Sequence, residues 1–587
     1  MRFIISVILF GVAAVMVAAG ILIHSVFHPP TTTVSTLRLK DPAPIVVIDT
    51  SSLDHISSTQ VISIKGGASG TVYVNNAGSI PTATQASSGH IVLAWGRESD
   101  VLAYIGNVSY QSVNASGQNG RLVVKTITGT ETSTPNPFDS DLWVERYEGD
   151  EYLSQQVTTP RGNLLVIATD GALPAPSVIT VTWKMDIDRS IPTNLFYGGL
   201  ALAIVGAVFF YLGWLSDRRK RRHRQGRMPR PPRPQRWKPD RSGLGPRRRG
   251  RRALPFVAVG MALPLALTGC TVFPSITNEP LPTSTPSPRG VAVTAPQFAR
   301  ILGEVIATLK TADEQRAENI AATRCDGAAL RFRAAQYKVN TQSKTLGIPF
   351  EIPNGTVRLL LPQKTTTWPR SVFAVIDDTE HPKNPSVAVV MTQQTPRDNY
   401  KINYSVALEP GAQIPSVPSA DSGAAVIYGD TELLSVTPSQ AIEHYGDLLI
   451  QGKDSAFVNS FEADSLQKQI GRDAKDKRAK DLGKTAKFAW TDIPTEDTPV
   501  VFAAAEGGAL VAVTLQENEK VTPATAGAAI TSSGAVKILA GVTSSMKGIE
   551  ASYQYQLLFY VPALSSQEKI QLLGYSYALT SAHKLGK

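Results

Sequence analysis

Residues 195–215 read LFYGGLALAIVGAVFFYLGWL, and none of these 21 side chains carries a charge. As a helix with a rise of about 1.5 Å per residue, the stretch is about 32 Å long, close to the ~30 Å hydrocarbon core of a bilayer. Helices of soluble proteins alternate apolar and polar faces, and this stretch does not. A second, almost uncharged run of 25 residues occupies 3–27, after Arg2. The sequence therefore predicts two transmembrane helices, at 1–30 and 193–215.

The segment that follows, residues 216–252, is strongly basic. It holds 17 Lys and Arg residues and two acids, for a balance of +15 in a chain whose net charge is +10, so the rest of the chain sums to −5. Dense like charge with many prolines predicts a disordered loop, and a polybasic loop beside a membrane helix attracts anionic lipids. Trp237 is its only aromatic residue, whereas stacking platforms for nucleic acid need several. We therefore expect anionic lipids, and no specific nucleic acid, as partners of this loop.

This basic loop also predicts the orientation of the chain. The positive-inside rule places Arg2 and residues 216–252 in the cytoplasm. Residues 31–192 are then outside, and residues 271–587 are outside as well if a third hydrophobic segment crosses back. We expect a multi-pass protein of the cell membrane with both large domains extracytoplasmic. Residues 1–30 are expected to form an uncleaved signal anchor, with a cleaved signal peptide as the alternative.

The third hydrophobic segment, residues 253–270, ends at a cysteine. A basic stretch, a short apolar run and small residues before Cys270 are the parts of a secretory signal. Leu267-Thr268-Gly269-Cys270 resembles the lipobox of bacterial lipoproteins, which implies a lipid on the Cys270 thiol and cleavage after Gly269. In those lipoproteins the motif is N-terminal, and here it is internal, so an uncleaved third transmembrane helix is the alternative. Residues 271–290, rich in Pro, Ser and Thr, are typical of an extended tether.

Residues 31–192 contain short runs of β-branched residues, such as 45–48 and 163–168, separated by Gly, Ser, Asn or Pro. This spacing predicts an all-β sandwich of eight or more antiparallel strands. Asp139-Ser-Asp141 and Asp186-Ile-Asp188 have the Asp-x-Asp pattern that holds a divalent metal in nucleotide-sugar transferases. The first lies in a Pro/Asn/Ser turn and the second just before the membrane, so we expect no metal at either.

Residues 291–587 appear as two similar halves. Val293-Thr-Ala-Pro-Gln297 and Val436-Thr-Pro-Ser-Gln440 each predict a helix start, with an N-capping Thr and a Pro in the first turn. Further helical sequence and then strands follow in both halves, which is an α+β order. The arrangement is similar to the cone-shaped fold of the nuclear-transport-factor type, an analogy that does not carry function. We predict two cone-like modules, 291–430 and 431–587, with a single larger α+β domain as the alternative.

Local motifs identify no catalytic, cofactor or metal site. The eight histidines lack metal-ligand spacing, and neither a phosphate-binding loop nor a Gly-x-Ser-x-Gly elbow occurs. Ser-x-x-Lys begins at Ser465, Ser544 and Ser581, but the companion Lys-Thr-Gly is missing, so we interpret it as background. The acidic cluster 377–382 is interpreted as a solvated hairpin loop, with a weak cation site as the alternative. Cys325 is expected to be a small buried residue.

The whole layout resembles an uncharacterised family of actinobacterial membrane-anchored envelope proteins. The stretches that carry the resemblance are Ser140–Val144, Asp170–Pro176 and Val406–Ala412. The resemblance implies location and architecture, and no activity. We therefore expect a non-enzymatic, membrane-anchored envelope protein whose outside domains bind a protein, a lipid or a wall polymer. The alternative is an enzyme that modifies envelope glycans or lipids through a site that no local motif shows.

Overall fold

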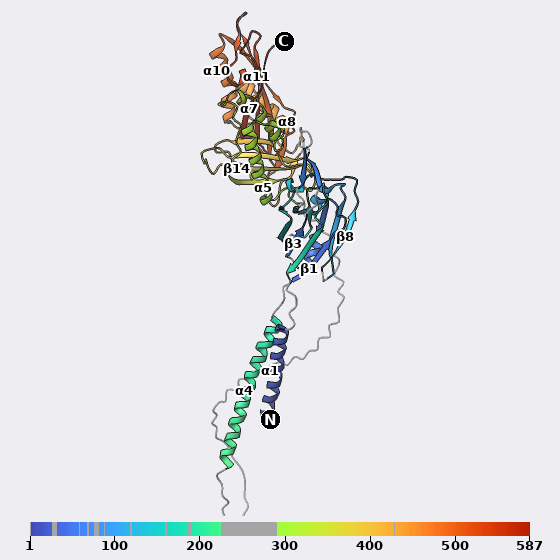
Figure 1. Cartoon of the computed structure of the whole chain (residues 1–587). Helices are drawn as coiled ribbons and strands as arrows, with labels where there is room; N and C mark the ends of the chain where they lie inside the picture. The colour runs from blue at the N-terminus through green and yellow to red at the C-terminus, as the bar shows by residue number, and fades with distance from the viewer. Residues whose placement is uncertain are drawn as a thin grey trace, which may run out of the picture. The chain divides into compact units, whose positions relative to one another are not determined.

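The computed structural model of the 587-residue chain forms two compact units, Met1–Pro30 with Asp186–Thr285, and Thr31–Met185 with Pro286–Lys587. Helices and strands are drawn in Figure 1. The structure describes residues 2–25, 32–57, 59–66, 70–74, 82–86, 89–117, 120–158, 161–184, 190–224, 290–427 and 429–586. The segment with the lipobox-like motif, the Pro/Ser/Thr tether and Asp186-Ile-Asp188 therefore lie outside the described residues.

The first unit contains two long helices, α1 (Arg2–Ser25) and α4 (Ser190–Arg224), packed against each other. The ring centroids of Phe3 and Phe210 are 4.8 Å apart. At the other end, a Cβ added to Gly199 would lie 2.8 Å from the side chain of Val17, so the pair is antiparallel and its backbones approach closely at a small residue. Phe3–Ile23 and Thr193–Ser216 are long and apolar enough to cross a membrane, and most of their surface is exposed.

One prediction about α4 is wrong. Residues 216–224 were expected to belong to a disordered loop, yet the helix continues through them to Arg224. Lys and Arg are good helix formers, and cations near the C-terminal end of a helix interact favourably with its dipole. Basic charge therefore extends this helix by two to three turns beyond its apolar part.

Residues 32–184 form two main sheets with a shared core. The strands of the first are β1 (Thr32–Arg38), β12 (Val178–Lys184), β3 (Gln60–Lys65) and β10 (Tyr152–Val157). Those of the second are β8 (Arg121–Ile127), β7 (Tyr110–Ser116), β2 (Ile45–Asp49), β11 (Asn163–Ala168), β6 (His90–Arg97) and β9 (Glu145–Asp150). Ile48, Ile62 and Trp183 belong to one buried cluster that both sheets line. The β-rich prediction for this region is confirmed.

This region also contains one parallel strand pair, two short helices and a separate hairpin. β2 and β7 pair in parallel, which is possible because a long connection separates them along the chain. Two short helices, α2 (Thr50–Asp54) and α3 (Glu98–Ile105), and a separate hairpin of β4 (Gly70–Val74) and β5 (Thr82–Ala86) complete it. Thr32 pairs with Lys184, so the chain enters and leaves this region at one place.

Residues 290–586 contain helices followed by strands, twice. The first half holds α5 (Ala295–Gln315), α6 (Glu318–Ala321), α7 (Gly327–Gln342), β13 (Thr356–Pro362), β14 (Arg370–Asp377), β15 (Val387–Gln393) and β16 (Lys401–Leu408). The second holds α8 (Pro438–Gln451), α9 (Ser465–Ile470), α10 (Arg472–Leu482), β18 (Ala486–Pro494), β19 (Val500–Ala503), β20 (Ala509–Pro523), α11 (Gly534–Ala540), β23 (Ile549–Val561) and β24 (Gln571–Lys584), besides the two-residue strands β21 (Ile530–Thr531) and β22 (Ser544–Ser545). The two-residue strand β17 (Val426–Ile427) lies at the end of the first half in sequence and pairs with β19 of the second. The predicted N-caps are confirmed, because Thr294 and Thr437 each form a capping box with the Gln three residues later.

A single ten-stranded sheet joins these two halves. β16 of the first half pairs with β24 of the second through two residue pairs, Ala407 with Tyr575 and Leu408 with Gly574. The helices of each half cover one buried cluster on one face. A third cluster belongs to both halves, and its Phe373 and Phe502 rings lie 6.0 Å apart. Each half therefore has its own hydrophobic core between its helices and the sheet, and a third core is formed by residues of both halves.

Candidate functional site

Residues 32–184 and 290–586 contact each other through buried ion pairs. Arg370, at the start of β14, donates hydrogen bonds to both carboxylate oxygens of Asp100 in α3, at 2.6 and 3.1 Å. The two side chains are 1% and 4% exposed. Arg97 binds the same carboxylate at 2.9 Å, and Trp368 packs against the core of the first region while its ring lies 3.7 Å from the Arg370 guanidinium. Two-point arginine–carboxylate bonds of this kind fix both position and orientation.

A second cluster crosses the same contact. The carboxylate of Asp141 is fully buried and accepts hydrogen bonds from the Arg324 guanidinium and, at 2.8 Å, from the backbone N–H of Tyr400. Arg324 also binds Glu304 at 2.9 Å, and Glu304 pairs with Arg146 of the first region. Removing one partner of such a buried pair leaves a charge without compensation, which costs about 3–5 kcal/mol. The contact between the two regions is therefore specific.

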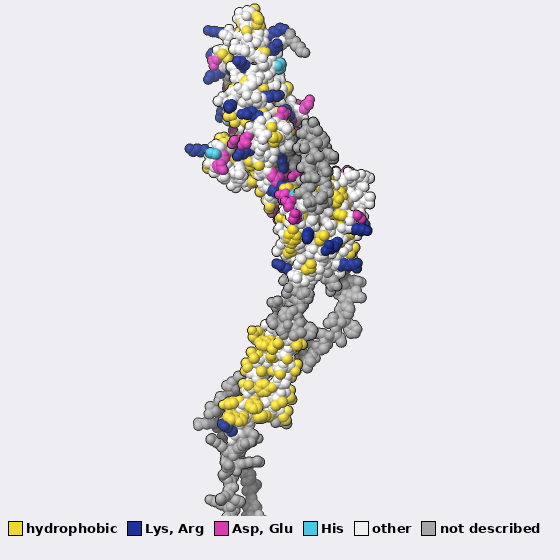
Figure 2. Space-filling model, in the orientation of Figure 1, with side chains coloured by type: hydrophobic (Ala, Val, Ile, Leu, Met, Phe, Trp, Pro, Cys, Tyr) yellow, Lys and Arg dark blue, Asp and Glu magenta, His cyan; other side chains and the backbone are white. Residues whose placement is uncertain are grey.

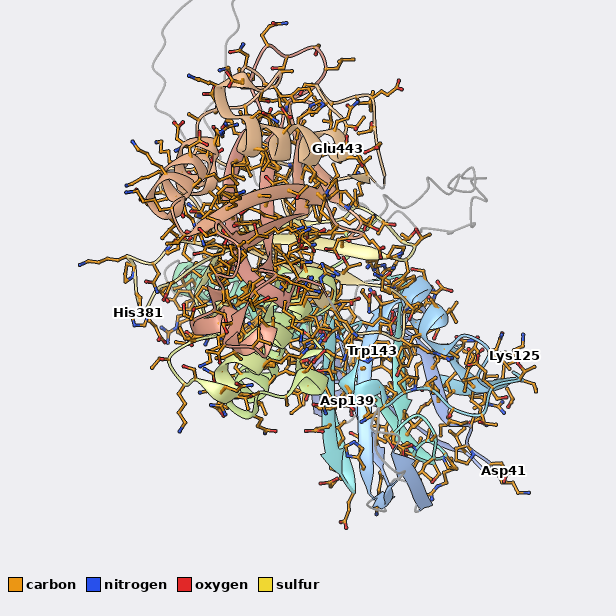
Figure 3. All side chains as sticks on the ribbon, turned by 90° about the horizontal axis from the view of Figure 1, so that it is seen from above. Asp41, Lys125, Asp139, Trp143, His381 and Glu443 are labelled. Atoms are coloured by element: carbon orange, nitrogen blue, oxygen red, sulfur yellow. The ribbon has the colours of Figure 1, made fainter. Side chains whose placement is uncertain are left out.

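The Asp139-Ser-Asp141 pattern thus has a role that its sequence did not reveal. It was interpreted as a turn, and Asp139 does end the short 3-10 helix Pro137–Asp139. Figure 3 shows Asp139 and Trp143 where the strands of the first region meet residues 290–586. Gln297 and Arg300 of α5 donate to main-chain carbonyls of residues 141–143. The turn is a docking element, and its partners lie more than 150 residues away in sequence.

Helices α10 and α11 lie at one end of the second half (Figure 1). A pocket of about 390 Å³ lies where α10 and residues 529–536 meet strands β18, β20 and β23. This size suits a small ligand. Its apolar lining consists of Leu482, Ala486, Phe488, Val521, Ala529, Ile530, Val536, Ile549 and Ala551. Arg478, Glu519 and Tyr553 are the larger polar side chains that line it.

Strand alternation places the polar groups of this pocket. Trp490 of β18 is paired with Glu519 of β20, so their side chains share the face that the helices cover. The Glu519 carboxylate accepts a hydrogen bond from Arg478 at 2.7 Å and one from the Trp490 indole at 3.1 Å. The Phe488 and Trp490 rings are stacked with centroids 5.3 Å apart, and the Arg478 guanidinium lies 5.4 Å from the Phe488 ring. Glu519 thus holds Arg478 at the wall of an aromatic-lined pocket.

Two further acids lie one step along the same face. Asp492 is paired across the strands with Glu517, and Glu517 forms a buried ion pair with Lys475 of α10 at 2.5 Å. Both carboxylate oxygens of Asp492 are buried, and no hydrogen-bond partner for them occurs in the part of the chain that the structure describes. Burial, and then the charge of Glu517, raise the pKa of Asp492 to about 8. The raised pKa favours the protonated form of Asp492 beside Glu517, an arrangement capable of proton donation.

The other residues singled out from sequence lie apart from this pocket. Cys325 is buried, and burial raises the pKa of its thiol to about 11, which makes it unreactive. Ser465 donates to Glu409 at 2.6 Å, and in the part of the chain that the structure describes no hydrogen bond joins it to the lysine that an acylating serine needs. In the 377–382 loop, Asp378 accepts hydrogen bonds from the backbone N–H groups of Glu380 and His381. Among the described residues, no group of three or more His, Cys, Asp and Glu side chains could hold a metal ion.

The pocket itself was missed by sequence reasoning. Its one sequence signal is Glu517-Asn-Glu519, two acids that alternate along a strand and so share a face. Such alternation is also typical of a solvent-exposed strand face. These acids are buried because the helices α8 and α10 cover that face. The packing of these helices on β18 and β20 is a long-range contact that local sequence does not predict.

The described part of the chain defines a multidomain, β-rich protein with two helices long and apolar enough to anchor it to a membrane. Residues 290–584 match the family model described as "Domain of unknown function (DUF8094)". This match covers half of the chain, and the chain belongs to that family. No curated protein and no solved structure matches it.

Proposed function

We propose that this chain is a membrane-anchored protein of the cell envelope whose two extracytoplasmic regions bind an envelope component, a protein, a lipid or a wall polymer. The observation that carries the proposal is the docking of residues 290–586 onto residues 32–184 through the Arg370–Asp100 and Arg324–Asp141 pairs. Combined with the antiparallel helices, this docking supports a definite path of the chain through a membrane.

The first step of the argument concerns the helix pair. Because α1 and α4 are antiparallel, Ser25 and Ser190 lie at the same end of the pair. If both helices cross a bilayer, residues 32–184 are on one side. The basic end of α4, which reaches Arg224, is on the other. The positive-inside rule assigns that basic end to the cytoplasm, where it and residues 225–252 are attracted to anionic lipids.

The second step concerns the return of the chain. Residues 290–586 dock on residues 32–184, so both regions belong to the same side of the membrane. The chain between 225 and 289 must then cross back, and its only long apolar stretch is 253–269. This stretch acts either as a third transmembrane helix or as a lipoprotein signal that ends at Leu267-Thr268-Gly269-Cys270. In the second case, lipid on Cys270 anchors residues 270–587 separately.

Binding is the role that the outside regions support best. The pocket beside Arg478 and Glu519 has apolar walls and a few polar groups, the usual composition of a ligand site. The test is binding of the purified full chain to vesicles of envelope lipids, to wall fragments and to purified envelope proteins. We expect saturable binding to one of the three. Absence of binding to all of them would contradict the proposal.

One observation favours the alternative of an envelope glycan- or lipid-modifying enzyme. Asp492 has a raised pKa and lies next to Glu517, which pairs with Lys475, and paired carboxyl groups supply general acid and base groups in hydrolases. The test is release of product from labelled envelope glycans and lipids by the full chain, compared with Asp492→Asn. Turnover that Asp492→Asn abolishes would replace the binding proposal with an enzymatic one.

A further inference from the structure

We propose that the pocket between α10, β18, β20 and β23 binds an amphipathic anion, a molecule with an acyl or similar apolar body and a carboxylate or phosphate head. The inference names a ligand class for the binding role proposed above and rests on it. It follows from the walls of the pocket, from the state of its charged groups and from the charge of the segment that borders it.

The walls provide room for an apolar body. Nine of the residues that line the pocket are apolar, and they come from α10, α11, the strands β18, β20, β21 and β23, and Ala529 before β21. Leu482, on the α10 side, is 46% exposed. Covering such surface with a ligand is favourable because it removes apolar area from water.

The acids of the pocket do not make it a cation site. Glu519, which lines the pocket, is paired with Arg478, and Glu517, one step along the same face, is paired with Lys475. Burial, and then the charge of Glu517, raise the pKa of Asp492, which favours its neutral form. Every negative charge on this face therefore already has a basic partner. A cationic head would have to displace one of these basic side chains, and the displaced side chain would lose its ion pair.

Arg478 and Tyr553 are the groups available to an anionic head. The Arg478 side chain is half exposed, and one of its terminal nitrogens donates a hydrogen bond to Glu519. A guanidinium has five N–H donors in a fork that fits carboxylate and phosphate. The Tyr553 hydroxyl has no hydrogen-bond partner among the described residues and lines the same pocket. Glu519 acts as a positioning residue, because it holds the guanidinium against the pocket wall.

The segment that borders the pocket, from α10 to the start of β18, carries more exposed cations than acids. Exposed residues from α10 to the start of β18 include six cations and three acids: Arg472, Lys477, Arg478, Lys480, Lys484 and Lys487, against Asp473, Asp476 and Asp481. Figure 2 shows Lys and Arg side chains at this end of the region. A surface of one sign raises the local concentration of ligands of the opposite sign, so it favours an anionic head.

The test is a competition experiment on the full chain in phosphatidylcholine nanodiscs, with empty nanodiscs as the blank and a fluorescent dodecanoic acid as the probe. The competitors are dodecanoate, lysophosphatidylglycerol, dodecyltrimethylammonium and inorganic phosphate. We expect dodecanoate, lysophosphatidylglycerol or both to displace the probe, which distinguishes a free acid from a lipid as the source. Phosphate, which has no apolar body, is expected to be at least tenfold weaker.

The decisive variant is Arg478→Gln. It should weaken binding of the anionic amphiphiles at least tenfold. Arg472→Gln, on the same helix, should change it less than twofold, because Arg472 pairs with the exposed Asp476 and does not line the pocket. Equal displacement by dodecyltrimethylammonium, or binding unchanged in Arg478→Gln, would overturn the inference. If the full chain binds wall fragments or proteins and no anionic amphiphile, the inference fails while the proposed function stands.

Discussion

Arg370 and Asp100 form a buried, two-point ion pair between residues 270 positions apart in the sequence. The pair joins α3 of the first region, which carries Asp100, to β14 of the second, which begins at Arg370. Together with the Arg324–Asp141 pair, it defines the contact between residues 32–184 and residues 290–586. This contact supports placing both large regions on one side of a membrane.

Loss of the Arg370 guanidinium should destabilise the docked pair of regions. Arg370→Ala leaves the Asp100 carboxylate buried with Arg97 alone, and we expect a loss of about 3–5 kcal/mol in the free energy of unfolding. The matched control is Arg358→Ala on β13, whose side chain is 49% exposed and pairs with Asp377 at 3.4 Å. Its loss should stay below about 1 kcal/mol. Denaturant unfolding of the full chain in detergent measures both, and equal effects would show that the buried pair contributes nothing special.

The contact should also hold the chain together after the connection is cut. A protease site inserted between residues 271 and 289 allows cleavage of the purified full chain. Because the ion pairs and Trp368 do not depend on the connection, we expect the N-terminal fragment to co-purify with a tagged C-terminal fragment. The combined variant Asp141→Ala with Arg370→Ala should release it. Separation of the unmodified fragments under mild conditions would show that the docking is weak.

Asp492 should make stability depend on pH. Its folded-state pKa of about 8 lies above the ordinary value of 3.8, so the folded state binds a proton that the unfolded state has lost between these values. Stability is therefore expected to fall as pH rises from about 4 to about 8. Asp492→Asn should flatten this part of the profile of melting temperature against pH. A variant with the same slope as the unmodified chain would show that other groups cause the dependence.

Cleavage before Cys270 has its own test. Immunoblotting with an antibody to the C-terminus detects either the full chain of 62.9 kDa or a fragment of about half that mass. The lipoprotein reading predicts the fragment, and predicts its loss in Cys270→Ala and with an inhibitor of the lipoprotein peptidase. A full-length band under every condition would leave 253–269 as a transmembrane helix.

Local signals predicted part of this fold and long-range contacts the rest. The starts of α5 and α8 were predictable because a capping box lies within four residues, Thr294 to Gln297 and Thr437 to Gln440. The joining of both halves in one sheet was left open, because it depends on two residue pairs between β16 and β24. The side chains of these residues do not indicate which strand each one pairs with.

The sites follow the same rule. Asp141 appeared to be a turn residue because its partner, Arg324, is 183 positions away. Glu517 and Glu519 were not singled out from sequence, because alternating acids are also typical of an exposed strand face and the helices that bury them could not be placed on that face. The lipobox-like motif needs no tertiary partner to be recognised, since a signal is processed in an unfolded chain, and its role stays a prediction.

The measurement that tests the central claim most directly is labelling of single introduced cysteines with a membrane-impermeant maleimide on intact cells. The positions are Lys125→Cys in the first region and His381→Cys in the second, both exposed, and Ser242→Cys in the basic loop, with the unmodified chain as background. We predict labelling of positions 125 and 381 on intact cells, and of position 242 only after permeabilisation. Labelling of position 125 without position 381 would contradict the placement of both regions on the outside.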